Sequence, residues 1–233
     1  MRFATSLILL ALTAASPAPP AVTQVAVELF TSQGCSSCPP ADALLEALAN
    51  QPNVIAITRP VTYWDRLGWK DTLGREENTR LQNDYAAKGH EGAGVYTPQT
   101  VVQGGDAAVG SDKRELARII AAEKAKPGPG IVATQTADGG RSVTISGASG
   151  QNGTVTVVAL RSQSTVRIGR GENGGRTIRY INVALADTVI GRWAGGNATL
   201  NVPGSVFHTA GADRYVMLIH AGPAGRIIAA RYI

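Results

Sequence analysis

The chain has 233 residues, of which 44% are hydrophobic and 17% charged, with a formal net charge of +5 at pH 7. This composition can fill ordinary folded cores, and the length allows one large domain or two small ones. The basic residues are scattered along the chain and aromatic residues make up only 5%. Because nucleic-acid binding requires a concentrated basic surface, we expect no nucleic-acid partner.

The first residues have the pattern of a secretory signal peptide. Arg2 supplies a positive start, an apolar run covers residues 6–15, and small residues and prolines follow up to Ala21. The apolar run is too short to span a membrane, so we expect export rather than stable membrane insertion. Residues 1–21 are therefore predicted to be a signal peptide, cleaved between residues 15 and 21, and the mature protein to be periplasmic or secreted.

Both cysteines of the chain lie in one motif, Cys35-Ser-Ser-Cys38. The motif follows an apolar run, Val25 to Phe30, and precedes a helical pattern that starts near Ala41. A helix N-terminus carries unpaired N–H groups and a partial positive charge, which favour a thiolate. Two cysteines at this spacing can interconvert between dithiol and disulfide, and export makes the disulfide persistent. The loop that they close is too short to stabilise a large fold strongly.

Strand and helix patterns alternate up to about residue 126 and indicate an α/β domain. The expected elements are strand 25–30, helix 42–50, strand 53–58, helix 75–88, strand 95–103, strand 107–109 and a helix capped by Ser111. Pro39 and Pro40 interrupt the start of the first helix. They either bend this helix or, with Cys38 as the cap, form its first turn.

The second half has a different periodicity. Residues 126–130, Lys-Pro-Gly-Pro-Gly, end the last helix and are typical of a linker. Beyond them polar and apolar residues alternate in segments such as 141–146, 153–158 and 214–219, with glycine-rich turns between. This pattern predicts a small all-β, sandwich-like domain over residues 131–233.

The first half resembles a thioredoxin-like domain, on the strand–Cys-x-x-Cys–helix unit and the Thr97-Pro98 step before a strand. More specifically, the chain resembles DUF1223, a family of secreted thioredoxin-like proteins catalogued as a domain of unknown function. The matching segments are residues 27–42, 63–71, 95–99 and 171–177. The resemblance implies a thioredoxin-like domain at 22–126 with a redox site. With the composition and periodicity described above, a linker at 127–130 and the all-β domain at 131–233 follow this domain. Unlike familiar thioredoxins, the chain has Gly34 before the motif and Ser36-Ser37 within it.

The resemblance also implies roles for individual residues. Cys35 is expected to be the exposed attacking thiolate, and Cys38 the resolving thiol. Thr97 and Pro98 are expected as a cis-proline loop that faces the sulfurs and receives substrate. Glu28, the only charge in the first strand, is close to where thioredoxin-like proteins hold a buried acid beneath the cysteines. It would exchange a proton with Cys38, unless it is a strand-end carboxylate paired with a surface cation.

Two further segments are candidates for contact with the site. Tyr63, Trp64, Asp65 and Trp69 lie in an aromatic insertion that either forms a substrate-binding wall beside the cysteines or packs on its own domain. Residues 171–175, Gly-Glu-Asn-Gly-Gly, lack the remaining residues of a phosphate-binding loop. We interpret them as a β-hairpin loop, which could extend over the thiol site and contribute polar contacts from Glu172, Asn173 and Arg176.

The leading hypothesis is an exported thiol–disulfide oxidoreductase that acts on a thiol- or disulfide-containing partner and is reset by a recycling redox partner. It needs no cofactor, because the electrons stay on sulfur. One alternative is a soft-metal protein that holds Cu(I) between the two thiolates, with His90 or a methionine as third ligand. Another is a non-catalytic interaction protein that binds through its β domain. The residues alone do not fix the redox direction.

Overall fold

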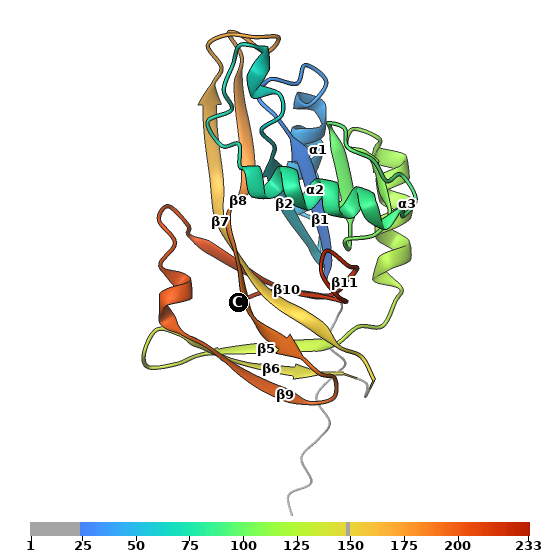
Figure 1. Ribbon diagram of the computed structural model, residues 1–233, viewed down its shortest axis with the longest axis vertical. Helices are drawn as coiled ribbons and strands as arrows, with labels where there is room; N and C mark the ends of the chain where they lie inside the picture. Colours follow the sequence, from blue (N-terminus) through green and yellow to red (C-terminus); the bar gives the residue numbers. More distant parts are fainter. Residues whose placement is uncertain (1–23, 148–149) are drawn as a thin grey trace, which may run out of the picture.

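The computed structural model describes residues 24–147 and 150–233, so the predicted signal peptide lies outside the described residues. The described chain is a mixed α/β fold with an eight-stranded mixed sheet, a three-stranded sheet and three α-helices (Figure 1). None of its helices is both long and apolar enough to cross a membrane. The elements of the first half are β1 (Val25–Thr31), α1 (Pro39–Ala49), β2 (Val54–Pro60), η1 (Asp65–Leu67), α2 (Glu76–Lys88), β3 (Gln99–Val102), β4 (Ala107–Val109) and α3 (Lys113–Lys124).

Four strands of the first half lie side by side in the order β2-β1-β3-β4. β1 and β2 are parallel, β3 is antiparallel to β1, and β4 is antiparallel to β3. Every residue of β1 and of β2 is buried, as expected for strands that are covered on both faces. The β-α-β-α-β-β-α order predicted from the sequence is therefore present, with shifts of a few residues at element ends.

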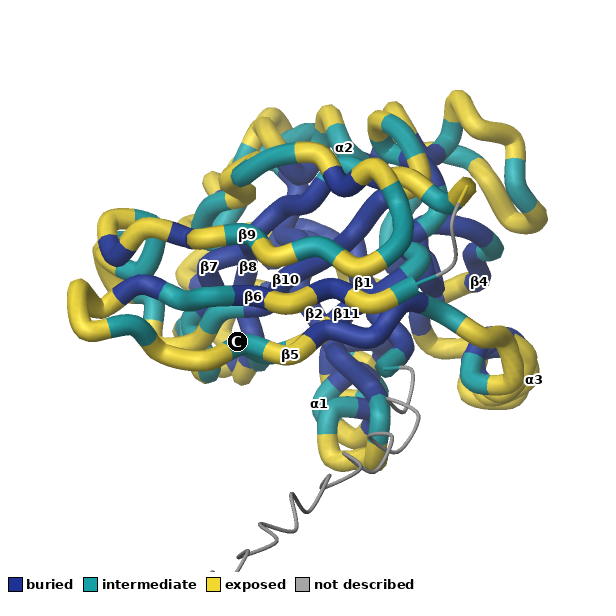
Figure 2. The backbone as a smooth tube through the Cα atoms, turned by 90° about the horizontal axis from the view of Figure 1, so that it is seen from below, coloured by how far each residue is buried: buried dark blue, intermediate teal, exposed yellow. Residues whose placement is uncertain are grey.

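The helices cover opposite faces of this sheet. α1 and α3 pack on Val25, Val27 and Leu29 of β1, whereas α2 brings Tyr85 against Phe30 on the other face. Figure 2, seen from below, shows α2 on one side of the strands and α1 and α3 on the other. The cap of α3 is Asp112, whose side chain accepts a hydrogen bond from the Glu115 amide, and not Ser111 as predicted.

The second half consists of strands and one short 3-10 helix, as its period-two pattern predicts. Its elements are β5 (Gly130–Gln135), β6 (Arg141–Ser146), β7 (Gly153–Arg167), β8 (Thr177–Trp193), β9 (Ala198–Val202), η2 (Gly204–Phe207), β10 (Arg214–His220) and β11 (Ile227–Tyr232). Strands β5, β6 and β9 form the small sheet. This sheet packs on β7, β10 and β11 around the buried Trp193.

A separate all-β domain is not confirmed, because four of these strands continue the sheet of the first half. The eight-stranded order is β11-β10-β7-β8-β2-β1-β3-β4, and β8 pairs in parallel with β2 at Thr58 and Val183. Without β8, the edge of β2 would expose unpaired backbone groups. The sheet also curls, since the Ile227 amide at the start of β11 donates to the Gln103 carbonyl at 2.7 Å. The two halves thus share one sheet and one buried core.

Candidate functional site

The two cysteines form a disulfide where β1 ends and α1 begins. Their Cα atoms are 5.4 Å apart. The Cys35 amide donates to the Ser32 carbonyl and the Cys38 amide to the Cys35 carbonyl, so two successive turns bring the sulfurs together. α1 starts at Pro39 with Cys38 as its cap residue, which is the arrangement in which Pro39 is the first helical residue.

Both cysteines are fully buried, with an exposed fraction of 0% for each. The sequence-based expectation of an exposed Cys35 is therefore wrong for this state of the protein. Ser36 and Ser37 between them are exposed, and the Ser37 hydroxyl lies 3.4 Å from the Cys35 sulfur. Solvent reaches the serines of the motif but not its sulfurs.

The cover over Cys35 includes the hairpin loop between β7 and β8, residues 168–176. Asn173 is fully buried, and its Nδ2 donates to the carbonyl oxygens of Gln33 at 3.0 Å and Cys35 at 2.8 Å. The Ser36 amide donates to the Glu172 carboxylate at 3.3 Å. The predicted projection of this loop over the thiol site is confirmed for Glu172 and Asn173. Figure 1 shows the β7–β8 tip beside the loops that follow β1 and β2.

Trp69 and Asp71 from the segment after β2 fix the Gln33 side of the motif. The Trp69 indole donates to the Gln33 side-chain oxygen at 2.9 Å, and the Gln33 amide donates to Asp71 at 2.8 Å. Trp69 also packs closely on Gly169, where an added Cβ would lie 3.0 Å from the ring. The same tryptophan thus contacts both the motif and the loop that covers it.

The Thr97-Pro98 peptide bond is cis, and the structure brings it to the cysteines through Trp64. The Trp64 indole donates to the Thr97 hydroxyl at 2.8 Å, and its Cβ lies 3.2 Å from the position of an added Cβ on Gly34. Pro98 borders Gly110 together with Ala41 of α1, which places the proline near the first turn of that helix. Trp64 therefore lies against Gly34 at the start of the motif and binds Thr97, and Pro98 lies near the first turn of α1.

Tyr63 and Asp65, the other two residues of the aromatic insertion, are used differently. Tyr63 packs in the cluster around Phe30 and Tyr85 on the α2 face. Asp65 accepts a hydrogen bond from the Asp71 amide at 3.0 Å and so closes the loop that contains η1. Both residues thus have contacts within the insertion or with α2, and a role of either in substrate binding stays a prediction.

Glu28 lies on the opposite face of the sheet from α1. Its neighbours Val27 and Leu29 pack on α1, so the alternation of the strand directs Glu28 toward α2. Its carboxylate accepts hydrogen bonds from Arg59 at 2.9 Å and from the Tyr85 hydroxyl at 2.7 Å. Glu28 therefore pairs with the buried cation Arg59 and not with a surface cation. The geometry does not place Glu28 beneath Cys38.

Asp42 is the buried acid on the cysteine side, and the sequence analysis missed it. It lies four residues after Cys38 on α1, so both side chains are on one face, and helical side chains lean toward the N-terminus. Asp42 is 5% exposed and accepts a hydrogen bond from the Thr31 hydroxyl at 2.9 Å. Its other oxygen, Oδ2, has no partner among the described residues. A carboxylate on the otherwise apolar buried face of a helix was the available signal.

Burial makes Asp42 an unusual carboxyl. It raises the pKa of Asp42 to about 7, with the nearby charge of Asp71 adding to the effect and the Thr31 hydrogen bond opposing it. Burial also raises the pKa of Asp71 and of Tyr180, whose hydroxyl has no partner among the described residues. A carboxyl that titrates near neutral pH can donate and accept protons under physiological conditions.

A metal centre finds little support in this geometry. The described residues contain no group of three or more His, Cys, Asp or Glu side chains that could hold a metal ion. His90, considered as a third ligand for Cu(I), lies in the loop after α2, two residues beyond the end of that helix. Within the described residues, the two cysteine sulfurs at the motif are joined in a disulfide in this structure.

Comparison with known proteins identifies the family. Residues 26–220 match the family described as "Protein of unknown function (DUF1223)". An X-ray crystal structure of a protein from Agrobacterium tumefaciens, a structural genomics target, is similar with 29% identity and a TM-score of 0.79, over 93% of this chain and 96% of that one. HBP35 of Porphyromonas gingivalis shares the fold at 14% identity and a TM-score of 0.59, over 91% of this chain and 75% of that one. No curated protein matches the sequence. The chain belongs to the DUF1223 family.

Proposed function

We propose that this protein is an exported thiol–disulfide oxidoreductase whose redox pair is Cys35 and Cys38. The observation that carries the proposal is the disulfide at the start of α1, with the buried carboxyl of Asp42 one turn further along the same helix face. A purely structural disulfide would have no need of a neighbouring carboxyl that titrates near neutral pH. Export rests on the N-terminal sequence pattern.

A thioredoxin-like frame for residues 24–126 supports the same proposal. The strand order β2-β1-β3-β4, the helix after the Cys-x-x-Cys motif and the cis Thr97-Pro98 bond are the features that such proteins share. In this frame Thr97, Pro98 and Trp64 form the surface that receives an extended segment of the partner.

The reaction is an exchange of sulfur–sulfur bonds. A partner thiolate attacks the Cys35 sulfur, a mixed disulfide forms, and Cys38 leaves with the electron pair of the broken bond. A second thiolate of the partner then attacks the partner's sulfur in the mixed disulfide. A disulfide forms within the partner, and Cys35 is released as a thiolate. The partner loses two electrons and becomes a disulfide while the cysteine pair becomes a dithiol. The reverse sequence reduces a partner disulfide, and in either direction a recycling redox partner restores the pair without a cofactor.

In this scheme Asp42 acts as the general acid and general base for Cys38. When Cys38 leaves as a thiolate, a protonated Asp42 can supply the proton, and when Cys38 attacks, the carboxylate can remove it. Thr31 holds one carboxyl oxygen at 2.9 Å, which leaves Oδ2 for this exchange. Asp42 thus takes the role that the sequence analysis gave to Glu28.

Access to Cys35 requires movement of the β7–β8 loop, because both sulfurs are fully buried. The contacts that must open are those of Asn173 with the carbonyls of Gln33 and Cys35 and that of Glu172 with Ser36. A partner that displaces this loop can use the freed Gln33 and Cys35 carbonyls as acceptors for its own N–H groups. The second half of the chain therefore controls which thiols reach the pair.

Trapping experiments test the proposal. Cys38→Ser should accumulate mixed disulfides with partners through Cys35, because the resolving thiol is gone, and Cys35→Ser should accumulate none. The reduction potential of the pair then assigns the direction, since a strongly oxidising value indicates a disulfide donor and a strongly reducing value a reductase. If Cys38→Ser traps no partner and Cys35 in the reduced protein fails to react with thiol reagents, the proposal is wrong.

A further inference from the structure

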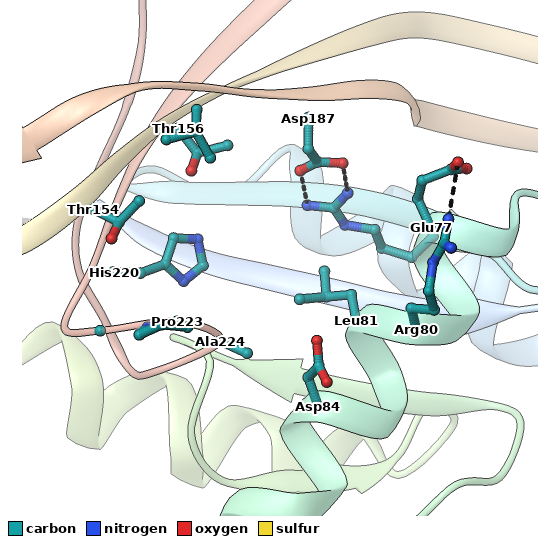
Figure 3. Close-up of a pocket in the computed structure, with 13 residues that line it drawn as sticks. Glu77, Arg80, Leu81, Asp84, Thr154, Thr156, Asp187, His220, Pro223 and Ala224 are labelled. Atoms are coloured by element: carbon teal, nitrogen blue, oxygen red, sulfur yellow. Dashed lines mark hydrogen bonds and ion pairs between the residues drawn. The ribbon is translucent and has the colours of Figure 1, made fainter.

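A cavity of about 530 Å³ lies between α2 and the strands of the second half, away from the cysteines (Figure 3). Its walls come from α2, from the paired strands β7 and β8, and from the turn between β10 and β11. The residues that line it are Arg59, Glu77, Arg80, Leu81, Asp84, Thr154, Thr156, Asp187, Val189, His220, Gly222, Pro223 and Ala224. The volume is that of a site for a small organic molecule.

His220 presents an unpaired hydrogen-bond acceptor to this cavity. The side chain is only 9% exposed, and its Nδ1 lies 3.2 Å from the Gly225 carbonyl oxygen. A carbonyl only accepts, so Nδ1 carries the hydrogen and Nε2 keeps a free lone pair. Burial lowers the pKa of His220, which keeps the ring neutral at neutral pH. Within residues 24–147 and 150–233, Nε2 has no protein partner.

Thr156 is a second buried polar side chain on the same wall. It is 7% exposed, and its hydroxyl makes no hydrogen bond to any described residue. Figure 3 shows Thr156 and His220 on the same side of the cavity. Neither the Thr156 hydroxyl nor His220 Nε2 is among the fully buried unpaired atoms of the described residues, so both face the open space, where a bound molecule can donate hydrogen bonds to them.

The unpaired charge on the wall is negative. All donors of Arg59 are engaged, by Glu28, Asp187 and Asn78, and Arg80 pairs with Glu77 at 3.2 Å. Asp84, one turn from Leu81 on α2, makes no ion pair or hydrogen bond with the described residues. The cavity therefore has an excess of acceptors and negative charge, although the chain as a whole carries +5.

Apolar side chains complete the wall. Leu81 extends into the middle of the cavity in Figure 3, with Pro223 and Ala224 facing it. Val189 is 65% exposed although it belongs to a long paired strand, and it lines the same space. We propose that this cavity binds a small organic cation, an amine joined to an apolar group, with the ammonium toward Asp84 and the apolar group on Leu81 and Val189.

Three probes of similar shape and different charge test this proposal with the purified full chain. Phenethylamine, phenethyl alcohol and hydrocinnamate are titrated separately, and binding is followed through backbone amide shifts in NMR spectra. Phenethylamine should saturate, with the largest shifts in α2 and in the β10–β11 turn. Its affinity should exceed that of the other two probes by about ten-fold, the effect of one favourable charge contact of about 1.4 kcal/mol.

Matched variants locate the contact. Asp84→Asn should weaken phenethylamine by about three-fold or more while leaving phenethyl alcohol unchanged, because only the charge is removed. Glu91→Gln removes a charge from an exposed acid outside the cavity and should change neither affinity. Equal affinities for the three probes, no saturation by about 10 mM, or shifts confined to the cysteine end of the molecule would each overturn the proposal.

Discussion

The Asn173 side chain and the Cys35 backbone are joined by a hydrogen bond of 2.8 Å across 138 residues of sequence. The bond connects the hairpin loop of the second half with the redox motif of the first. Because the Asn173 amide also holds the Gln33 carbonyl, one buried side chain fixes the backbone on the N-terminal side of the motif. The reactivity of the disulfide thus depends on a residue outside the first half of the chain.

Replacing Asn173 with alanine should speed up reduction of the disulfide. Two hydrogen bonds, each with a net value of about 1 kcal/mol, oppose opening of the loop, so reduction by dithiothreitol should become about ten-fold faster or more. The measurement is the rate of thiol release, followed with a chromogenic thiol reagent. Asn197→Ala, in the exposed turn before β9, is the control and should react like the wild type. Identical rates for all three proteins would mean that thiols reach the disulfide without loop movement.

Asp42 should make stability fall as pH rises. Burial raises the pKa of Asp42 to about 7, so the folded chain keeps a proton that the unfolded chain, with a carboxyl pKa of about 3.9, has already lost. The contribution of this group is fully present below about pH 4 and is lost progressively up to about pH 7, by roughly 1.4 kcal/mol per pH unit at most.

Asp42→Asn removes this dependence, because asparagine does not titrate. Its free energy of unfolding should exceed that of the wild type by an amount that grows from pH 4 to pH 8. The difference should reach a few kcal/mol, because it is set by the raised pKa of Asp42. Urea unfolding of the oxidised proteins at several pH values measures it. A stability difference that is the same at every pH would show that Asp42 is ionised throughout the folded state.

The same variant separates the two acidic residues in redox chemistry. If Asp42 exchanges a proton with Cys38, Asp42→Asn should abolish an inflection near pH 7 in the rate of mixed-disulfide resolution. Glu28→Gln should keep that inflection, because Glu28 lies on the other face of the sheet with Arg59 and Tyr85. An inflection lost in Glu28→Gln and kept in Asp42→Asn would return the role to Glu28.

Arg59→Met should be strongly destabilising. Arg59 is 1% exposed and bridges Glu28 of β1 with Asp187 of β8, so its loss leaves a buried carboxylate without its cation. The free energy of unfolding, measured in urea, should fall by about 3–5 kcal/mol. The double variant Glu28→Gln with Arg59→Met should recover part of this loss. A single variant as stable as the wild type would contradict the structural role of this ion pair.

Trp64→Phe tests the substrate surface around the cis peptide bond. The variant keeps the Cβ that lies beside Gly34 but loses the 2.8 Å hydrogen bond to Thr97. Turnover of a protein disulfide such as insulin should show a kcat/KM several-fold lower, consistent with one lost hydrogen bond of about 1 kcal/mol. Reduction of the pair by dithiothreitol should be unchanged. If reduction by dithiothreitol slowed by the same factor as the turnover of insulin, the substitution would have disturbed the motif as a whole.

The elements of this fold could be predicted from the sequence because their signals are local. Apolar runs at residues 25–30 and 53–58 gave the two buried strands, and period-two alternation gave the strands of the second half. The Cys-x-x-Cys motif before a helix identified the candidate site. The position of the thiol-facing acid could not be predicted in the same way, because β1 is buried on both faces and shows no alternation that would orient Glu28.

The sequence by itself determined which residues form strands and helices and that Cys35 and Cys38 lie at a helix start, since both depend on neighbours within a few positions. Only the tertiary structure decided that β8 pairs with β2, that Asn173 covers Cys35 and that Asp42 rather than Glu28 lies on the cysteine side. The first two outcomes depend on contacts between residues more than a hundred positions apart, and the third depends on the face of the sheet to which β1 directs Glu28. Local patterns do not encode such choices, because many pairings satisfy the same periodicity.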